Sequence, residues 1–262
     1  MTIRDDRAPL VPDDVVWAVD GGTAGHASSL LVLPHAGGNA HNYAQWRELL
    51  SDDVRLLIGQ YPGRGARFSE PLPRDIGELA EPVLRCLPED TEDLVILGHS
   101  MGSLVAFEIA RSLTRLGRPP RALIASSCRS PFLPNPSPVH AEKLTNEELV
   151  AAIEARGGTD HAILSEPEIR EIILPAIRAD FTIDDQYRCL DGTERLHCRI
   201  LAIGGADDPI VPAEALLRWS EATDGPTATR FLPGGHFYFQ QQPHAFIALV
   251  QELIGGSPAR HE

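Results

Sequence analysis

The sequence lacks the features that nucleic-acid-binding, membrane-spanning and exported proteins need. It has 37 acidic against 23 basic side chains and a formal net charge of −14, which offers no basic face to phosphates or to an anionic membrane. No apolar run approaches the roughly 18 residues of a membrane-spanning helix. The N-terminus, "MTIRDDRAPL", has no apolar signal-peptide core. We therefore expect a cytoplasmic protein with neither nucleic-acid nor membrane partners.

Cysteine is also scarce, and its spacing excludes the common metal and redox motifs. The four cysteines show no C-x-x-C pattern and lie in or beside apolar segments, so we expect reduced core thiols (Cys86, Cys128, Cys189 and Cys198). The histidines show no H-E-x-x-H or paired metal spacing. No G-x-G-x-x-G follows the first strand. We expect no metal site and no cofactor.

Short apolar runs alternating with helical patterns are what the sequence does contain. Each run is followed by a glycine- or proline-bearing turn, and most then lead into a helical pattern. Such alternation predicts an α/β fold with a mostly parallel central sheet flanked by helices, as a single domain over residues 1–262. An additional edge strand is expected between Asp13 and Asp20. The six runs are "SLLVLPH", "VRLLIGQYPG", "DLVILGHS", "RALIASSC", "RILAIGG" and "TATRFLPGG".

The alternation stops between Arg129 and Leu196, where no strand-like run occurs. After a proline-rich connector, a first helix is predicted from the capping box of Thr145 and Glu148. A second is predicted to begin at Ser165, with a kink at Pro175. Its apolar stripe comprises Ile169, Ile172, Ile173, Ile177 and Phe181. The insertion at about 129–196 is expected to form a helical lid over the strand ends; the alternative is extra packing helices without a gating role.

The pentapeptide Gly98-His99-Ser100-Met101-Gly102 lies between a predicted strand and a predicted helix. This context favours a nucleophile elbow, in which the glycines permit a strained turn and close packing of strand on helix. The Ser100 hydroxyl would then be exposed above the sheet, at the N-terminus of the helix. We predict Ser100 as a nucleophile.

A serine needs a base, and the base needs an acid to orient it. In the order Ser, acid, His, "LPGGHFYF" offers His236 as the base and "GGADDPIVP" offers two adjacent aspartates. In the pattern G-x-x-D-P-x-V, counted from Gly205, the acid falls on Asp208. Asp207 stays open as the alternative.

A tetrahedral oxyanion requires hydrogen-bond donors, and backbone amides are the expected ones. The first is the N–H of Met101, the residue after the nucleophile, and the second comes from the loop after an earlier strand. The turn "PHAGG" makes the amide of Ala36 the candidate. His35 and His99 border this site and are expected to make local hydrogen bonds.

With these residues in hand, the chain resembles the type II thioesterases, stand-alone α/β-hydrolases associated with polyketide synthases and nonribosomal peptide synthetases. The resemblance runs from about Leu30 to Leu253. It rests on "LPHAGGNAHNYAQW", "YPGRGARFSEPL", "LGHSMGSLVAFEIA", "GGADDPIVP" and "LPGGHFYF".

The resemblance implies hydrolysis of acyl thioesters on the phosphopantetheine arm of an acyl carrier protein or peptidyl carrier domain, removing stalled or aberrant acyl groups. The stripe of the insertion, including Ile173, would face the acyl chain, and Phe237 is a further substrate-binding candidate. Because carrier domains are typically acidic, docking on this acidic chain would need a local basic patch. Arg64 and Arg67 in "PGRGARF" are the candidates.

Three alternatives remain at this point. Oxygen esters need the same machinery, so a carboxylesterase or lipase acting on small-molecule esters fits the triad too. A second is a thioesterase that releases a finished product or a fatty acid. The third is a non-catalytic hydrolase-fold receptor, which the complete set of catalytic residues disfavours.

Overall fold

Seven strands form one sheet in the computed structural model, which describes residues 12–19, 26–89, 91, 93–158, 161–189 and 194–255. The spatial order is β1-β3-β2-β4-β5-β6-β7. Strand β1 is antiparallel to β3, and all other neighbours are parallel. The strands are β1 (Val16–Ala18), β2 (Ser28–Leu33), β3 (Val54–Gly59), β4 (Leu94–His99), β5 (Ala122–Ser126), β6 (Arg199–Gly205) and β7 (Thr227–Leu232).

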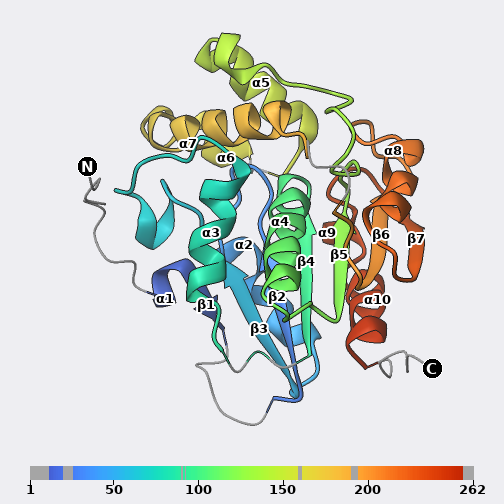
Figure 1. The fold of residues 1–262 in the computed structure, drawn as a ribbon. Coiled ribbons are helices and arrows are strands. Elements are labelled where there is room, and N and C mark those ends of the chain that lie inside the picture. The colour runs from blue at the N-terminus through green and yellow to red at the C-terminus, as the bar shows by residue number, and fades with distance from the viewer. Residues whose placement is uncertain are drawn as a thin grey trace, which may run out of the picture.

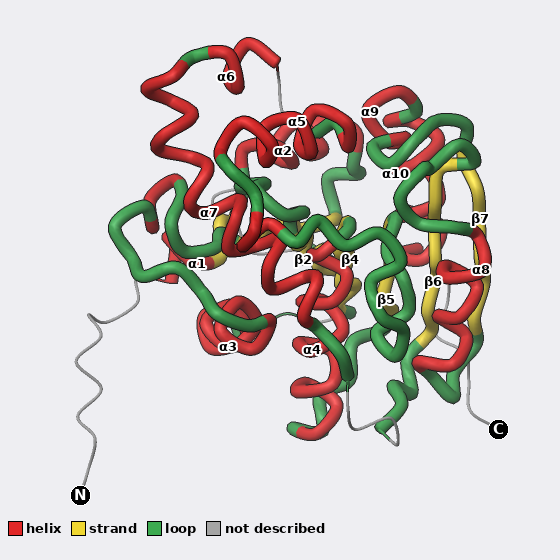
Figure 2. The backbone as a smooth tube through the Cα atoms, turned by 90° about the horizontal axis from the view of Figure 1, so that it is seen from above, coloured by secondary structure: helices red, strands yellow, loops and turns green. Residues whose placement is uncertain are grey.

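Helices cover both faces of this sheet, which is why its central strands are apolar on both sides. On β2, Leu31 and Leu33 pack into one core cluster with α3 (Ile76–Cys86) and α4 (Met101–Arg115). Leu30 and Val32 pack into a second cluster with α10 (Pro243–Gly255). Figures 1 and 2 show the sheet between these two helix layers. The predicted α/β fold class with a mostly parallel sheet is confirmed.

The smaller helical elements join the strands to these layers. They are the α-helices α1 (Pro12–Val15), α2 (His41–Ala44), α8 (Ala213–Leu217) and α9 (Tyr238–Gln241), and the 3₁₀ turns η1 (Gln45–Leu49), η2 (Gly65–Arg67), η3 (Ala141–Lys143) and η4 (Arg218–Ala222).

All six apolar runs become strands, and the edge strand is shorter than predicted. Only Val16–Ala18 pairs with β3, because Pro12–Val15 forms a helical turn. Asp20, the end of the predicted strand, lies outside the described residues.

The insertion between β5 and β6 places the helices α5 (Asn146–Arg156), α6 (His161–Ser165) and α7 (Pro167–Gln186) above the sheet. The predicted capping box at Thr145 and Glu148 is present at the start of α5. These helices share a separate hydrophobic cluster, which comprises Val139, Ala141, Leu149, Ile153, Leu164, Leu174 and Ile177. The insertion is therefore a packed unit with a core of its own.

The second predicted helix differs in its start and in its buried face. Its N-cap is Glu166, without a side-chain cap, because the predicted cap Ser165 ends the separate helix α6. Ile169 and Ile172 are 42% and 54% exposed. The buried face of α7 comprises Leu174, Ala176, Ile177, Asp180 and Ile183. An apolar pattern cannot reveal this face, because one of its members is a carboxylate.

Candidate active site

Ser100 occupies a strained corner between β4 and α4. Its φ of 53° lies in the left-handed region, which costs a non-glycine residue free energy and clusters at functional sites. The corner is fixed by two hydrogen bonds: the Ser100 N–H donates to Ser126 O at 2.8 Å, and the Ser103 hydroxyl donates to Gly98 O at 2.7 Å. A Cβ on Gly98 would lie 2.1 Å from Gly102 O. The glycines allow the close packing that the elbow motif predicts.

His236 links Ser100 to Asp208 in one hydrogen-bonded row. Its Nε2 lies 3.0 Å from Ser100 Oγ, and its Nδ1 lies 2.9 Å from Asp208 Oδ2. His236 comes from the loop between β7 and α9, and Asp208 from the loop after β6. In a parallel sheet these loops meet at the carboxyl edge of the strands, where Ser100 also lies. Three segments far apart in the sequence thus place their side chains at one point.

The structure separates the two adjacent aspartates. The Asp208 side chain is buried, and its Oδ1 accepts hydrogen bonds from the N–H groups of Ile210 and Val211 at 2.9 and 3.2 Å. Asp207 is exposed, and its N–H donates to Gly234 O. Of the two, Asp208 is the carboxylate that the geometry places against His236.

The charged form of Asp208 is stabilised where it lies. Burial by itself raises the pKa of this carboxyl group, but the hydrogen bond and charge of His236 and the amides of Ile210 and Val211 outweigh burial and lower it. Asp208 therefore stays ionised at neutral pH and can accept the Nδ1 proton of His236.

Two backbone amides near Ser100 have no hydrogen-bond partner among the described residues. Met101 begins α4 at the positive end of its helix dipole, and Ala36 lies in the turn after β2 and borders the same pocket. Within the described residues, neither amide donates a hydrogen bond to the protein itself. Both are therefore candidates to receive a negative charge developing next to Ser100.

His35 and His99 make the local hydrogen bonds predicted for them. The Nδ1 of His35 is 2.7 Å from the Tyr43 hydroxyl, and the Nδ1 of His99 is 2.8 Å from Ser126 Oγ. Burial, with a contribution from the nearby His236, lowers the pKa of His35 to about 3 and that of His99 well below its usual value. Both imidazoles are therefore neutral at physiological pH.

A pocket opens from Ser100 toward the insertion between β5 and β6, which we call the lid from here on. Its walls come from the turn after β2, the segments after β5 and β6, the loop of His236 and the helices α5 and α7. Phe237 forms part of the wall, with its ring centroid 4.9 Å from that of His35 and 5.2 Å from that of His236. Its other lining residues include Ala36, Ser127, Cys128, Arg129, Val139, Ile153, Arg156, Ile177, Phe181 and Val211.

Ile173, a predicted substrate-binding residue, is placed elsewhere. It packs half-buried against the lid's own hydrophobic cluster and is not among the residues that line the pocket. Ile177, one turn later on α7, and Phe181 line the pocket instead. The prediction for Ile173 is corrected in this respect; Phe237 does lie where contact with a ligand is feasible.

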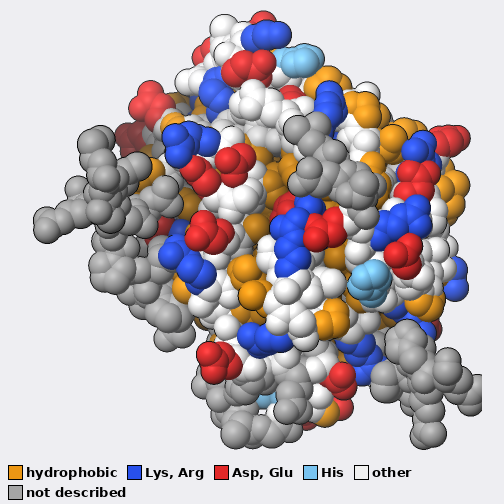
Figure 3. Space-filling view, in the orientation of Figure 1, with side chains coloured by type: hydrophobic (Ala, Val, Ile, Leu, Met, Phe, Trp, Pro, Cys, Tyr) orange, Lys and Arg blue, Asp and Glu red, His pale blue; other side chains and the backbone are white. Residues whose placement is uncertain are grey.

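Arg64 and Arg67 do not form the surface patch predicted for them. Arg64 is 8% exposed and forms a buried ion pair with Asp180. Arg67 is 2% exposed; it donates to Gln60 O at 2.7 Å and pairs with Glu70 through two hydrogen bonds of 2.7 and 2.6 Å. Both charges are already satisfied inside the protein. On the face shown in Figure 3, acidic and basic side chains are interspersed instead of separated by sign.

Arg67 is therefore expected to contribute to stability. Arg67→Ala should lower the free energy of unfolding by about 2 kcal/mol, because charged hydrogen bonds are lost and Gln60 O loses a donor. Arg74→Ala is the matched control, because Arg74 forms an exposed pair with Glu78 that should contribute little. Equal urea midpoints for the two variants would contradict this role for Arg67.

Two pocket residues, Ser127 and Cys128, carry no recognisable sequence signal. Ser127 has a φ of 43° and a buried hydroxyl without a hydrogen-bond partner among the described residues. Cys128 also lines the pocket, and burial raises its pKa to about 12, so it stays a neutral thiol. The sequence "ASSCRS" gives no hint of either position. The four cysteines are free thiols.

Metal and membrane features are absent from the part of the chain that the structure describes. No group of three or more His, Cys, Asp or Glu side chains there could hold a metal ion. None of its helices combines the length and the apolar character needed to cross a bilayer.

Comparison with known proteins places this chain in a family. A family model described as thioesterase domain matches residues 28–254. The chain is 36% identical over 240 residues to thioesterase PikA5 of Streptomyces venezuelae, covering 90% of this chain and 84% of that protein. It is 36% identical over 229 residues to the probable cadicidin biosynthesis thioesterase of Streptomyces griseus, covering 87% of this chain and 63% of that protein.

A solved structure agrees with these relatives. The type II thioesterase BorB from the borrelidin biosynthetic cluster superposes with a TM-score of 0.81 at 35% identity, covering 94% of this chain and 100% of that one. The chain therefore belongs to the thioesterase family and has the α/β-hydrolase fold of the type II thioesterases.

Proposed function

We propose that the protein removes stalled or aberrant acyl groups from the phosphopantetheine arm of acyl carrier or peptidyl carrier domains by hydrolysing the thioester. The observation that carries this proposal is the hydrogen-bonded row Ser100–His236–Asp208. Its Ser100 and His236 line a pocket under the lid. The relatives support the setting, because their names connect them to the biosynthesis of cadicidin and borrelidin.

Ser100, His236 and Asp208 act as nucleophile, base and orienting acid. His236 Nε2 accepts the Ser100 hydroxyl proton while Oγ attacks the thioester carbonyl carbon. The N–H groups of Met101 and Ala36 bind the oxyanion. The C–S bond then breaks, and His236 returns the proton to the leaving thiolate. The product of this half-reaction is an acyl-Ser100 ester and a free pantetheine thiol.

Deacylation uses the same groups. His236 takes a proton from water, the resulting hydroxide attacks the acyl-serine carbonyl, and the proton returns to Ser100 Oγ as the carboxylic acid leaves. Throughout, the ionised Asp208 keeps Nδ1 protonated and stabilises the imidazolium that forms. Neutral His35 and His99 add no second positive charge beside it.

The test uses carrier domains loaded with acetyl and longer acyl groups, mixed with the protein and followed by intact-protein mass spectrometry. Ser100→Ala is the control, and matched oxygen esters are assayed in parallel. We expect rapid, Ser100-dependent unloading of carriers and weak ester hydrolysis. Carriers that stay loaded while esters are cleaved quickly would identify a carboxylesterase instead.

Ile177 and Ile173 offer a matched test of the acyl pocket. Ile177→Ala should change the ratio of kcat/KM between short and long acyl groups about tenfold, since one methylene of contact in a hydrophobic pocket amounts to about 1–3 kcal/mol. Ile173→Ala, one turn earlier on α7 and outside the pocket lining, should leave the ratio within about twofold. A chain-length series of acyl thioesters measures both. Equal shifts in both variants would contradict the placement of the pocket.

A further inference from the structure

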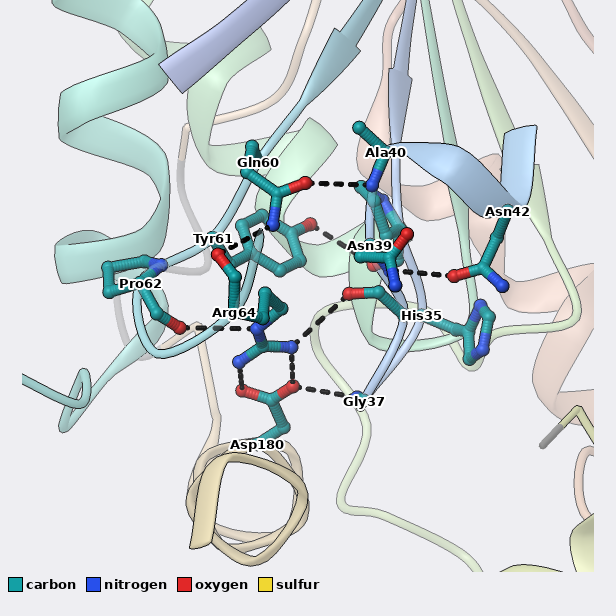
Figure 4. A network of polar contacts seen from close by, with 12 residues as sticks. His35, Gly37, Asn39, Ala40, Asn42, Gln60, Tyr61, Pro62, Arg64 and Asp180 are labelled. Atoms are coloured by element: carbon teal, nitrogen blue, oxygen red, sulfur yellow. Dashed lines mark hydrogen bonds and ion pairs between the residues drawn. The ribbon is translucent and has the colours of Figure 1, made fainter. Parts of the chain in front are cut away.

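A carboxylate of the lid reaches into the turn that carries Ala36. Asp180 lies on α7, is fully buried, and its Oδ2 accepts a hydrogen bond of 2.7 Å from the N–H of Gly37. The two residues are 143 positions apart. Figure 4 shows α7 lying against the turn, with Asp180 pointing at the Gly37 amide. The lid and the turn next to the nucleophile are therefore joined by a direct hydrogen bond.

Arg64 holds this carboxylate in place. Its Nη1 and Nη2 lie 2.5 and 2.9 Å from the two oxygens of Asp180 in a bidentate pair. The same guanidinium donates to Gly38 O at 3.3 Å and to Pro62 O at 3.1 Å. Arg64 thus joins three segments: α7, the turn after β2 and the turn after β3.

Gly37 lets the lid approach this closely. Its φ is +78°, and a Cβ there would lie 2.9 Å from Cγ1 of Ile177. Ile177 precedes Asp180 by one turn of α7, so one face of the helix contacts the turn through both side chains. Ile177 also lines the pocket, which places this contact next to the acyl site.

These hydrogen bonds fix the peptide planes on both sides of Ala36. The Ala36 N–H shares its plane with the His35 carbonyl, which accepts a hydrogen bond of 2.9 Å from the Gly38 N–H. The Ala36 carbonyl shares its plane with the Gly37 N–H, which is bonded to Asp180. With both planes held, the direction of the Ala36 N–H is set. Because the Gly38 N–H follows the Gly37 peptide in the same turn, moving Asp180 away would free the second plane and with it the hydrogen bond that holds the first.

We propose that Asp180, held by Arg64, is a positioning residue that aims the Ala36 N–H at the oxyanion, so that docking of α7 on the turn completes the oxyanion hole. The inference rests on the proposed function of Ala36. Stability alone is a weak reason for a buried ion pair, since replacing both partners by apolar residues is often neutral or stabilising. A fall in kcat can therefore be compared with the change in melting temperature, and this comparison separates a positioning role from a purely structural one.

The test compares two double variants that differ only in the side chain at position 180. Arg64→Met/Asp180→Leu replaces the pair by apolar side chains. Arg64→Met/Asp180→Asn removes the same two charges but keeps a side-chain oxygen that can accept from Gly37. We expect the Leu variant to fold with a lowered melting temperature, because the Gly37 N–H and the carbonyls of Gly38 and Pro62 lose their partners. Its kcat should fall about 10²-fold, as for a lost oxyanion donor. KM and the pH profile of kcat/KM should stay unchanged, because pocket and triad are untouched. The Asn variant should regain at least about tenfold in kcat.

Two results would overturn the proposal: wild-type kcat in the folded Leu variant, or equal kcat in the Leu and Asn variants. If the Leu double variant does not fold, Asp180→Asn and Asp180→Ala form the second comparison. Both remove the negative charge, and only Asn keeps the acceptor. Equal kcat for these two would equally overturn it.

A second readout separates this proposal from that of carrier editing. Phosphonylation of Ser100 by a fluorophosphonate needs the nucleophile and the oxyanion donors but no thioester or carrier. If the wild-type protein leaves acyl carriers intact yet reacts with the probe, the proposed substrate fails while the Asp180 variants still report on positioning. The Leu variant should then react about 10²-fold more slowly than the wild-type protein, and at least about tenfold more slowly than the Asn variant.

Discussion

Asp208→Ala is expected to lower kcat about 10⁴-fold, whereas Asp207→Ala should lower it less than about threefold. Loss of the orienting carboxylate of a Ser-His-Asp triad has effects of this size, and of the two aspartates it is Asp208 that lies against His236. Asp207 contributes an N–H to Gly234 O, which alanine retains. The two substitutions remove the same group from adjacent positions, so each is the control for the other.

Turnover of an acyl thioester, measured together with the melting temperature of each variant, checks this result. Asp208→Ala also removes the acceptor for the N–H groups of Ile210 and Val211, so a drop in stability is expected beside the drop in kcat. Asp208→Asn, which keeps an acceptor for these amides, should recover stability without recovering turnover. The reverse ranking of Asp207 and Asp208 would show that the acid has been misassigned.

Gly102→Ala is expected to abolish folding of the domain. A Cβ at this position would lie 2.2 Å from Leu33 O and 2.5 Å from Pro34 O. Both neighbours are backbone atoms at the end of β2, which cannot move away as a side chain could. Relief of the clash requires α4 to separate from the central sheet, where most of the core is buried. We expect no soluble folded protein at 25 °C.

Gly255→Ala is the control, because nothing lies within 4 Å of the Cβ that it would add. It should fold like the wild-type chain, with a melting temperature within about 2 °C, since isolated surface changes have small effects. Far-UV circular dichroism and thermal melts of the purified variants make the comparison. A Gly102→Ala protein that melts cooperatively near the wild-type temperature would show that β2 and α4 are less tightly held than their contact indicates.

The sequence predicts the sheet and the proximity of Ser100, Asp208 and His236, because the signals for both are local. A buried parallel strand needs a short run of Leu, Ile and Val, and each of the six runs forms one. Ser100, Asp208 and His236 lie in turns directly after strands. Parallel topology brings such turns to one edge, so local patterns are enough to predict that Ser100, Asp208 and His236 lie close together.

The positions of Arg64, Asp180 and Ile173 could not be predicted in this way. An arginine in a glycine-rich loop has the same local pattern whether it faces solvent or a carboxylate 116 residues later in the chain. Asp180 interrupts an apolar stripe and shifts the buried face of α7, which leaves Ile169 and Ile172 exposed. Only tertiary pairing decides these positions, and a single sequence does not record it.

The separate hydrophobic cluster of the insertion bears on how such a protein can diversify. The side chains that hold α5, α6 and α7 together are largely distinct from those that hold the helices to the sheet. Mutations that change the pocket wall formed by the insertion can therefore accumulate without destabilising the sheet. They also need not displace Ser100, Asp208 and His236 at its carboxyl edge. A lineage can explore new acyl preferences in this segment while the inherited chemistry stays constant, provided that α7 still meets Gly37.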